Sequence, residues 1–179
     1  MKKHTIIIGW TSYLGQTLVR TFAEEGHTLS VIGRKSPERI LKNVNYYLSA
    51  LFNKDISSNL KKILDERGKL NNLIFLQRYR DKDDDWKGEF EVSLTITKDT
   101  IDSLIDSFDE NGKSIVAISS LASDFVAEEQ PLSYHVAKAG LNQMVSYYAV
   151  KLGSKGIRVN CVSPGIFLKE NNVKYERLY

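Results

Sequence analysis

The sequence has a single cysteine, Cys161, and no long apolar run. A lone cysteine has no disulfide partner within the chain, which indicates a reduced, cytoplasmic protein. The apolar stretch after Lys2 and Lys3 is shorter than the roughly 7–15 residues that a signal peptide requires. No stretch approaches the ~18 residues of a membrane helix. We therefore expect neither secretion nor a membrane partner.

The chain also lacks a basic stripe. Its 25 Lys and Arg are scattered among 22 Asp and Glu, for a net charge of +3, which argues against a nucleic-acid partner. The acidic cluster DKDDDW at residues 81–86 is interpreted as a solvated loop before a helix. There are no internal repeats, linkers or low-complexity segments, so residues 1–179 are expected to form one domain, without a metal site.

The chain does contain alternating apolar strands and amphipathic helices. Such alternation is typical of parallel βαβ units with right-handed crossovers, and strands without polar alternation fit a sheet covered on both faces. The predicted fold is α/β: a doubly wound (Rossmann) parallel sheet of about six strands with helices on both faces. The strands are expected at residues 4–8, 28–33, 43–49, 72–76, 113–119 and 156–163, and the helices at residues 14–25, 37–42, 56–67, 87–108 and 131–152.

The first strand-to-helix turn, GWTSYLG at residues 9–15, has the pattern of a phosphate-binding turn. Ligands of this fold bind at the carboxyl ends of the strands, where glycines let the backbone approach a phosphate and a helix N-terminus attracts it. Thr11 and Ser12 can bond a phosphate or cap the helix. On this turn alone, a dinucleotide site and a turn without a ligand are equally open. The residues assigned to a cofactor here are Gly9, Thr11, Ser12, Tyr13, Leu14 and Gly15.

Arg34 and Lys35 follow the second predicted strand. NAD-binding versions of this fold carry an acidic residue there, which holds the ribose 2′-hydroxyl. A guanidinium instead forms bidentate bonds with a phosphate, so this position favours NADP(H) over NAD(H). The alternative is an exposed arginine at a strand end.

Tyr134 and Lys138 are four residues apart and share one face of the helix predicted at residues 131–152. The spacing alone says little, because Tyr147 and Lys151 repeat it in mid-helix. Context distinguishes the first pair, which lies near the start of the helix and follows a strand that ends in two serines.

Together these segments resemble those of the short-chain dehydrogenase/reductase family. The most specific block is residues 115–165, with IVAISS, YHVAK and GIRVNCVSPG at family-like separations. The turn and the Gly-Arg pair at residues 33–34 support it in the same order, so the resemblance covers residues 5–167. It implies an NAD(P)-dependent enzyme that reduces a carbonyl or oxidises an alcohol of a small molecule. The resemblance also assigns Pro164 and Gly165 to the cofactor.

The resemblance implies a role for each residue of the catalytic group. Hydride transfer to a carbonyl leaves an alkoxide that needs a proton, and Tyr134 is expected to supply it. A free phenol has a pKa of about 10, and the Lys138 ammonium one turn away is expected to favour the phenolate and lower that pKa. By resemblance, Lys138 also binds the nicotinamide ribose. Ser120 is expected to hydrogen-bond the substrate oxygen, with Ser119 as the rival; the alternative is that these residues only pack or cap.

Several positions depart from the family pattern. Tyr13 replaces the middle glycine of the first turn, so we expect either a ring turned away from the pyrophosphate or weaker cofactor binding. Ala50 aligns with an acidic residue that contacts adenine. LQRYR at residues 76–80 replaces an Asn-Asn-Ala-Gly turn near the adenosine ribose, where it either crowds the cofactor or makes new contacts. Ser93, also assigned to the catalytic group, aligns with an asparagine that organises a water-linked proton relay.

The chain after the Pro-Gly pair is shorter than is usual in the family, which continues through a substrate lid and a seventh strand. We expect residues 166–179, or a partner subunit, to cover the edge of the sixth strand. Lys169 aligns with a threonine that touches the nicotinamide. A short lid leaves a wide, wet site, which lowers turnover.

The resemblance implies a homodimer or homotetramer, paired through helices that match residues 89–108 and 131–152. Two alternative functions stay open. One is a catalytically degenerate relative that acts as a binding or assembly subunit, favoured by the departures. The other is sugar-nucleotide or related chemistry on the same fold.

Overall fold

Six parallel strands form one sheet in the computed structural model, which describes residues 2–49, 55–80 and 85–165. Their order across the sheet is β3-β2-β1-β4-β5-β6. The chain winds outward from β1 to β3, crosses back to β4 beside β1, and then winds the other way to β6. This confirms the predicted doubly wound fold. The strands are β1 (His4–Ile8), β2 (Thr28–Gly33), β3 (Val44–Leu48), β4 (Asn72–Phe75), β5 (Ser114–Ile118) and β6 (Arg158–Val162).

The helices lie close to their predicted positions. One long helical run becomes four consecutive elements, from α3 to the 3-10 turn η2. No helix in the described ranges is long and apolar enough to cross a membrane. The helical elements are α1 (Tyr13–Glu24), α2 (Asp55–Arg67), α3 (Trp86–Phe90), η1 (Glu91–Thr95), α4 (Ile96–Leu104), η2 (Ile105–Ser107), η3 (Leu121–Ser123) and α5 (Leu132–Gly153).

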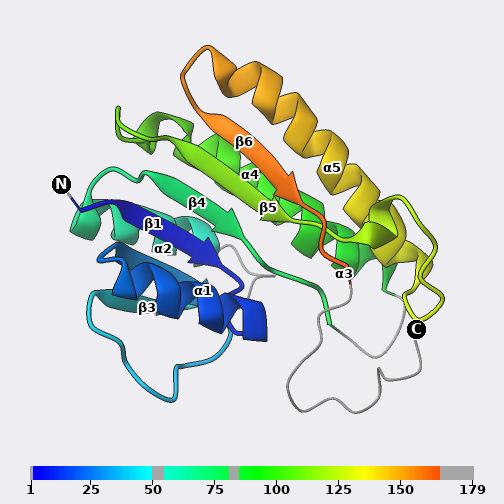
Figure 1. Ribbon diagram of the computed structural model, residues 1–179, viewed down its shortest axis with the longest axis horizontal. Coiled ribbons are helices and arrows are strands. Elements are labelled where there is room, and N and C mark those ends of the chain that lie inside the picture. The colour runs from blue at the N-terminus through cyan, green and yellow to red at the C-terminus, as the bar shows by residue number, and fades with distance from the viewer. Residues whose placement is uncertain (1, 50–54, 81–84, 166–179) are drawn as a thin grey trace.

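Apolar cores lie on both faces of the sheet. The isoleucines of β1 are 0% exposed, as a strand covered on both faces requires. Ile6 and Ile8 belong to a core shared with α2, α4 and α5, whereas Ile7 belongs to a second core shared with α1. In Figure 1, α1 accordingly lies on the viewer's side of the sheet and α4 on the far side.

Strand β5 is buried less evenly than expected. Ile115 and Ala117 are buried, but Val116 and Ile118 are only half-buried. These two face an apolar groove of about 550 Å³ on the α1 side of the sheet. Residues 166–179, which were expected to cover the edge of β6, lie outside the described residues, so the lining of this groove is given for the described residues only. The groove is lined by Leu14, Leu18, Phe22, Ile74, Val116, Ile118, Val162, Pro164 and Gly165.

The helix predicted at residues 37–42 is wrong, because bends and turns join β2 to β3. These strands pair in parallel, so the connection must run back along the sheet, which it does here without a helix. Ile40 in this segment is 77% exposed. A helix of only a few residues that buries no apolar face is not stable. Asn43 adopts a positive φ of 65° just before β3 begins.

The helical run from α3 to η2 contains a π-helical segment, η1. Polar side chains surround it: Thr97 Oγ1 donates to the Ser93 carbonyl at 2.9 Å, and Gln77 Nε2 donates to Thr97 Oγ1 at 2.8 Å. Segments of this kind often occur at functional sites. Here it places Ser93 on a widened, buried turn that packs against α5.

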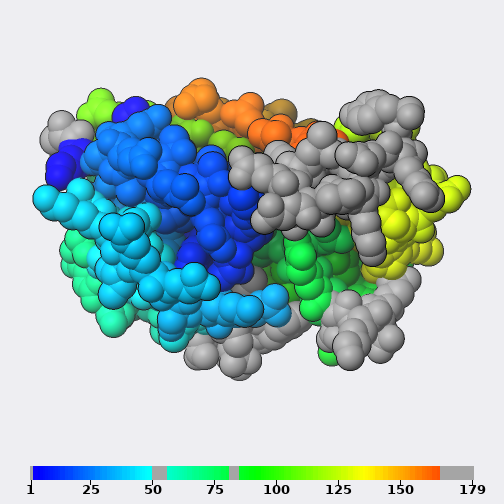
Figure 2. All heavy atoms as spheres, turned by 60° about the horizontal axis from the view of Figure 1, so that its bottom comes forward, coloured from blue at the N-terminus to red at the C-terminus, as the bar shows by residue number. Residues whose placement is uncertain are grey.

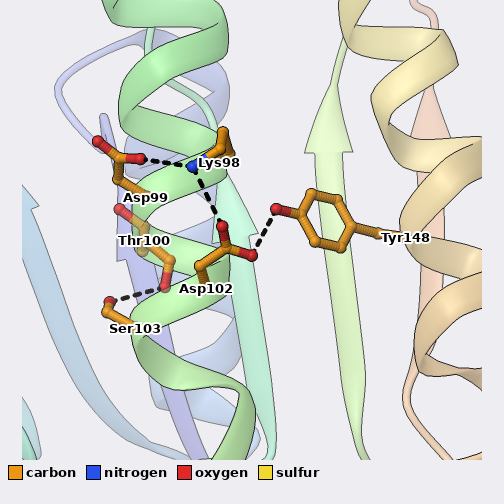
Figure 3. A network of polar contacts seen from close by, with 6 residues as sticks. All are labelled: Lys98, Asp99, Thr100, Asp102, Ser103 and Tyr148. Atoms are coloured by element: carbon orange, nitrogen blue, oxygen red, sulfur yellow. Dashed lines mark hydrogen bonds and ion pairs between the residues drawn. The ribbon is translucent and has the colours of Figure 1, made fainter.

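A polar network links α4 to α5 (Figure 3). The buried Tyr148 on α5 donates its hydroxyl to Asp102 Oδ1 on α4 at 2.6 Å. On its other oxygen, Asp102 forms an ion pair with Lys98 at 3.2 Å. Lys98 and Asp102 both lie on α4, so this exposed pair does not join the helices. The Tyr148 hydrogen bond is a polar link between α4 and α5.

Tyr148→Phe should therefore lower the free energy of unfolding by about 1.5–3 kcal/mol, because it removes a hydrogen bond to a charged group. Urea unfolding followed by circular dichroism measures the change. Tyr147→Phe is the matched control, since its ring is 58% exposed, and it should change stability by less than about 0.5 kcal/mol. Equal losses in the two variants would contradict the role of this bond.

Candidate functional site

The carboxyl ends of β1 and β4 meet where the winding direction reverses. Gly9 follows β1 with a positive φ of 86°, and a Cβ there would lie 2.4 Å from the Gln77 backbone nitrogen. Only glycine fits this approach. The first turn and the turn after β4 are therefore held together at the position where doubly wound folds bind ligands.

The first turn is capped from within. Ser12 is the N-cap of α1, and its Oγ accepts a hydrogen bond from the Gly15 nitrogen at 3.1 Å. Two roles were expected for the Ser12 hydroxyl, capping the helix or binding a phosphate. In the structure it caps the helix. Thr11 is half-buried, and Leu14 packs against the core on the α1 side. Tyr13 begins the helix with its ring 57% exposed.

Trp10, between the two glycines of this turn, is a residue that our sequence reasoning missed. Its indole is 7% exposed and packs edge-on against Tyr46 of β3, with ring centroids 5.2 Å apart. A Cβ on Gly33 would lie 2.5 Å from Trp10 Nε1, so the indole lies against the end of β2. The available signal was a large aromatic residue in a turn that approaches Gly33.

Arg34 and Lys35 directly follow β2, and both are exposed. Figure 2 shows the N-terminal residues (blue) between the light-blue surface of the β2–β3 region and the green surface of the α3 region. Gly33, which precedes them, approaches Trp10 and Thr11, so the two cations follow a residue that contacts the first turn. Ala50, expected on the adenine side, lies outside the described residues.

Tyr134 and Lys138 lie in the first two turns of α5 and share a face, as predicted. Tyr134 is 7% exposed and Lys138 3% exposed. Lys138 Nζ lies 5.6 Å from the tyrosine ring centroid and donates to the Ile118 carbonyl, the last of β5, at 3.0 Å. Burial lowers the pKa of Lys138 to about 8. The ammonium is thus fixed at the carboxyl end of the sheet beside the phenol.

The two serines after β5 have different surroundings. Ser119 is buried, and its hydroxyl donates to the Lys138 carbonyl at 3.2 Å. Ser120 is half-buried and caps η3, with its Oγ accepting from the Ala122 nitrogen at 3.2 Å. This geometry favours Ser120 over Ser119 as the serine that can reach a ligand. Pro164 lies next to this turn, since its carbonyl accepts from the Leu121 nitrogen at 3.2 Å.

The LQRYR segment makes new contacts within the protein. Gln77 is buried and bonds the helical run, and Tyr79 donates its hydroxyl to Asp85 Oδ2 at 2.8 Å. Arg78 lies over the ring of Tyr134, with Cζ 4.4 Å from its centroid, and its Nη2 donates to Gln130. Tyr134 therefore has a second cation beside it, a contact that sequence reasoning did not find.

Ser93 and Glu89 form a buried polar pair on the helical run that packs against α5. Ser93 is 2% exposed and donates its hydroxyl to Glu89 Oε1 at 2.5 Å; Glu89 is 3% exposed. Ser93 was expected to align with the asparagine of a proton relay, and its hydroxyl is directed to a carboxylate. Glu89 is a second group that the sequence analysis missed.

The arrangement matches known proteins in sequence and in fold. Residues 69–176 match the family described as enoyl-(acyl carrier protein) reductase. The glucose 1-dehydrogenase of Gluconobacter oxydans is 25% identical over 97% of this chain and 72% of its own length. The 3-oxoacyl-(acyl carrier protein) reductase of Thermotoga maritima is 27% identical over 91% of this chain and 73% of its own. A short-chain dehydrogenase from Leptospira borgpetersenii, solved with bound NAD+, superposes with a TM-score of 0.81 at 21% identity, over 94% of this chain and 73% of that one.

Proposed function

The chain belongs to the short-chain dehydrogenase/reductase family of oxidoreductases, and we propose that it is an NADP(H)-dependent enzyme that interconverts a carbonyl and an alcohol. The observation that carries this proposal is the buried Tyr134–Lys138 pair at the carboxyl end of β5. A buried ammonium beside a phenol is an arrangement suited to general acid/base chemistry.

The residues present fit a nicotinamide dinucleotide. The turn after β1 approaches the end of β4 closely because Gly9 has no side chain. Helix α1 begins at this turn, and its N-terminal N–H groups can bind a phosphate. Arg34 and Lys35 are exposed and can bind a second phosphate. We assign Gly9, Thr11, Ser12, Tyr13, Leu14, Gly15, Arg34, Lys35, Pro164 and Gly165 to its binding, with Tyr134 and Lys138 on the ribose. When bound, the cofactor supplies or accepts the hydride.

The chain's own residues do the rest of the chemistry. The Ser120 hydroxyl donates a hydrogen bond to the carbonyl oxygen of the substrate. As hydride transfer turns that oxygen into an alkoxide, the Tyr134 phenol donates its proton to it. Lys138 favours the phenolate that remains, because its ammonium lies close in a buried setting. Ser93, assigned to the catalytic group, is hydrogen-bonded to the buried Glu89 on the helical run that packs against α5.

A cofactor titration tests this proposal. NADPH and NADH are each titrated while nicotinamide fluorescence is followed, and NADPH should bind more tightly. Failure of both to bind at millimolar concentration would overturn the proposal.

Arg34→Glu tests the preference for NADP(H). The variant should weaken the binding of NADPH by about 10–100-fold, since it replaces a cation that can bind the 2′-phosphate with a residue of the same negative charge as that phosphate. The affinity for NADH should change little. Arg39→Glu makes the same charge change on the same exposed segment and should leave both affinities near wild type. An equal loss for NADPH and NADH would contradict the assignment of Arg34 to the 2′-phosphate.

A second candidate is a degenerate relative that binds a ligand without turnover. The contact of Arg78 with the Tyr134 ring favours it, because the guanidinium occupies space beside the phenol. Tyr13 at the start of α1 favours it as well. NADPH binding together with no reduction across a panel of 3-oxo esters and sugars would support this candidate.

We further propose that residues 1–179 act as one domain in the cytoplasm and assemble as a homodimer or homotetramer through α4 and α5. Val150, exposed on α5, supports such pairing.

A further inference from the structure

Asn142 is a polar residue of α5 for which the proposed chemistry gives no role. It lies four positions after Lys138 and eight after Tyr134, so the helical repeat places the three residues on one face of α5. This face is turned toward the end of β5, because Lys138 donates to the Ile118 carbonyl. Asn142, which is half-buried, therefore continues the face that carries the proposed catalytic pair.

The side chain of Asn142 joins three elements. Its Nδ2 donates to Ser123 Oγ in η3 at 2.8 Å, and its Oδ1 accepts from Cys161 Sγ in β6 at 3.2 Å. Ser123 Oγ in turn donates to the Ser120 carbonyl at 2.7 Å. A continuous chain of hydrogen bonds thus runs from β6 through α5 to the backbone of Ser120, the serine proposed to bind the substrate oxygen.

The chemistry of the donors fixes the direction of this chain. An amide nitrogen can only donate, so Ser123 Oγ accepts from Asn142 and keeps its own proton to give. That proton lies between two acceptors, the Ser120 carbonyl at 2.7 Å and the carboxylate of the exposed Asp124 at 2.8 Å. The Ser123 nitrogen also donates to the Ser120 carbonyl, at 3.1 Å. Ser123 therefore holds Ser120 by two donors, and Asn142 holds the hydroxyl that supplies one of them.

The hydroxyl of Ser120 itself is left for a ligand. Its Oγ accepts from the Ala122 nitrogen at 3.2 Å, and its own proton has no acceptor among the described residues. The direction in which this hydroxyl can donate depends on the orientation of the Ser120 backbone, which Ser123 restrains.

We propose that Asn142 is a positioning residue of the active site: through Ser123 it fixes the backbone of Ser120 and so orients the Ser120 hydroxyl toward the substrate oxygen. The part that concerns the substrate rests on the proposed function. The restraint on the turn after β5 does not, and it can be measured without turnover.

The restraint is measured by hydrogen exchange followed by mass spectrometry. The amides of Ser119, Leu121, Ala122, Ser123 and Asp124 are all hydrogen-bonded, so their exchange reports opening of this turn. In Asn142→Ala, residues 119–124 should exchange about 10-fold faster, because the turn loses one supporting hydrogen bond.

Gln143→Ala is the matched control, since it truncates the next residue of α5, which is exposed, and it should leave the exchange of residues 119–124 near wild type. Ser123→Ala is the second variant in case Asn142→Ala does not fold. It removes the middle of the same chain and should give the same increase. Unchanged exchange of residues 119–124 in these two variants would overturn the proposal.

Action through Ser120 is tested by a double-mutant cycle on kcat/KM for the reduction of ethyl acetoacetate with NADPH. Asn142→Ala should lower kcat/KM by about 10-fold in the wild-type background, the effect of losing one hydrogen bond that positions a reacting group, with NADPH affinity unchanged. In the Ser120→Ala background the same substitution should lower it by less than about twofold, because no hydroxyl remains to be oriented.

A residue that only packs α5 against β6 would give a different result. Its loss would lower kcat/KM by the same factor in both backgrounds, and that outcome would refute the positioning role even if the turn exchanged faster. A wild-type chain that binds NADPH but reduces no carbonyl would contradict the proposed function, and the exchange of residues 119–124 would still decide whether Asn142 holds the turn.

Discussion

Tyr134→Phe should lower the rate of carbonyl reduction by about 10²–10⁴-fold, the range in which a positioned general acid contributes. The substitution removes one oxygen and leaves the ring against which Arg78 lies. Packing at this buried position should therefore survive, and NADPH should still bind, weakened at most by the loss of one hydrogen bond to the ribose, about 0.5–1.5 kcal/mol. Steady-state oxidation of NADPH with ethyl acetoacetate, together with a fluorescence titration of the cofactor, measures both quantities.

The chain supplies a closely matched control for this variant. Lys151 Nζ lies 5.5 Å from the ring centroid of Tyr147, compared with 5.6 Å for Lys138 and Tyr134. Tyr147, however, is 58% exposed and lies farther along α5. Tyr147→Phe should leave the rate within about twofold of wild type. If the two variants had equal rates, Tyr134 would lose its assigned role, and the degenerate-relative alternative would gain support.

Gly9→Ala should destabilise the protein by about 2–5 kcal/mol, the sum of a positive φ and a steric overlap. The new Cβ would lie 2.4 Å from the Gln77 nitrogen and 2.5 Å from the Gln77 Cα, both of them backbone atoms. Neither can rotate away, so the ends of β1 and β4 must separate. Urea unfolding would give the loss of stability, and an NADPH titration would show weaker binding at the opened turn.

Gly26→Ala separates the two causes. Gly26 also has a positive φ, of 83°, but no atom lies within 4 Å of its Cβ position. That variant should therefore lose only about 1 kcal/mol, from backbone strain alone. Equal losses in the two variants would mean that the close approach of β1 and β4 is not what requires glycine at residue 9.

The central strands could be predicted from sequence because they are short apolar runs whose own residues indicate burial, as with the isoleucines of β1. The Tyr134–Lys138 face could be predicted because the helical repeat brings residues four apart together. The helix at residues 37–42 was wrong because local composition does not reveal whether a neighbouring surface exists for it. The contacts of Trp10 with Gly33 and of Arg78 with Tyr134 join residues far apart in sequence, so no local pattern predicts them.

The central place of β1 also has a consequence for how the protein folds as it is synthesised. β1 pairs with β2 on one side and with β4 on the other. The His4 nitrogen donates to Asn71 Oδ1, a contact between residues 67 positions apart. On the ribosome, the first strand to emerge therefore keeps an unpaired apolar edge until β4 has been made. Such late, long-range pairing slows folding and exposes the nascent chain to aggregation, and β1 waits longer for its second neighbour than any other strand of this sheet.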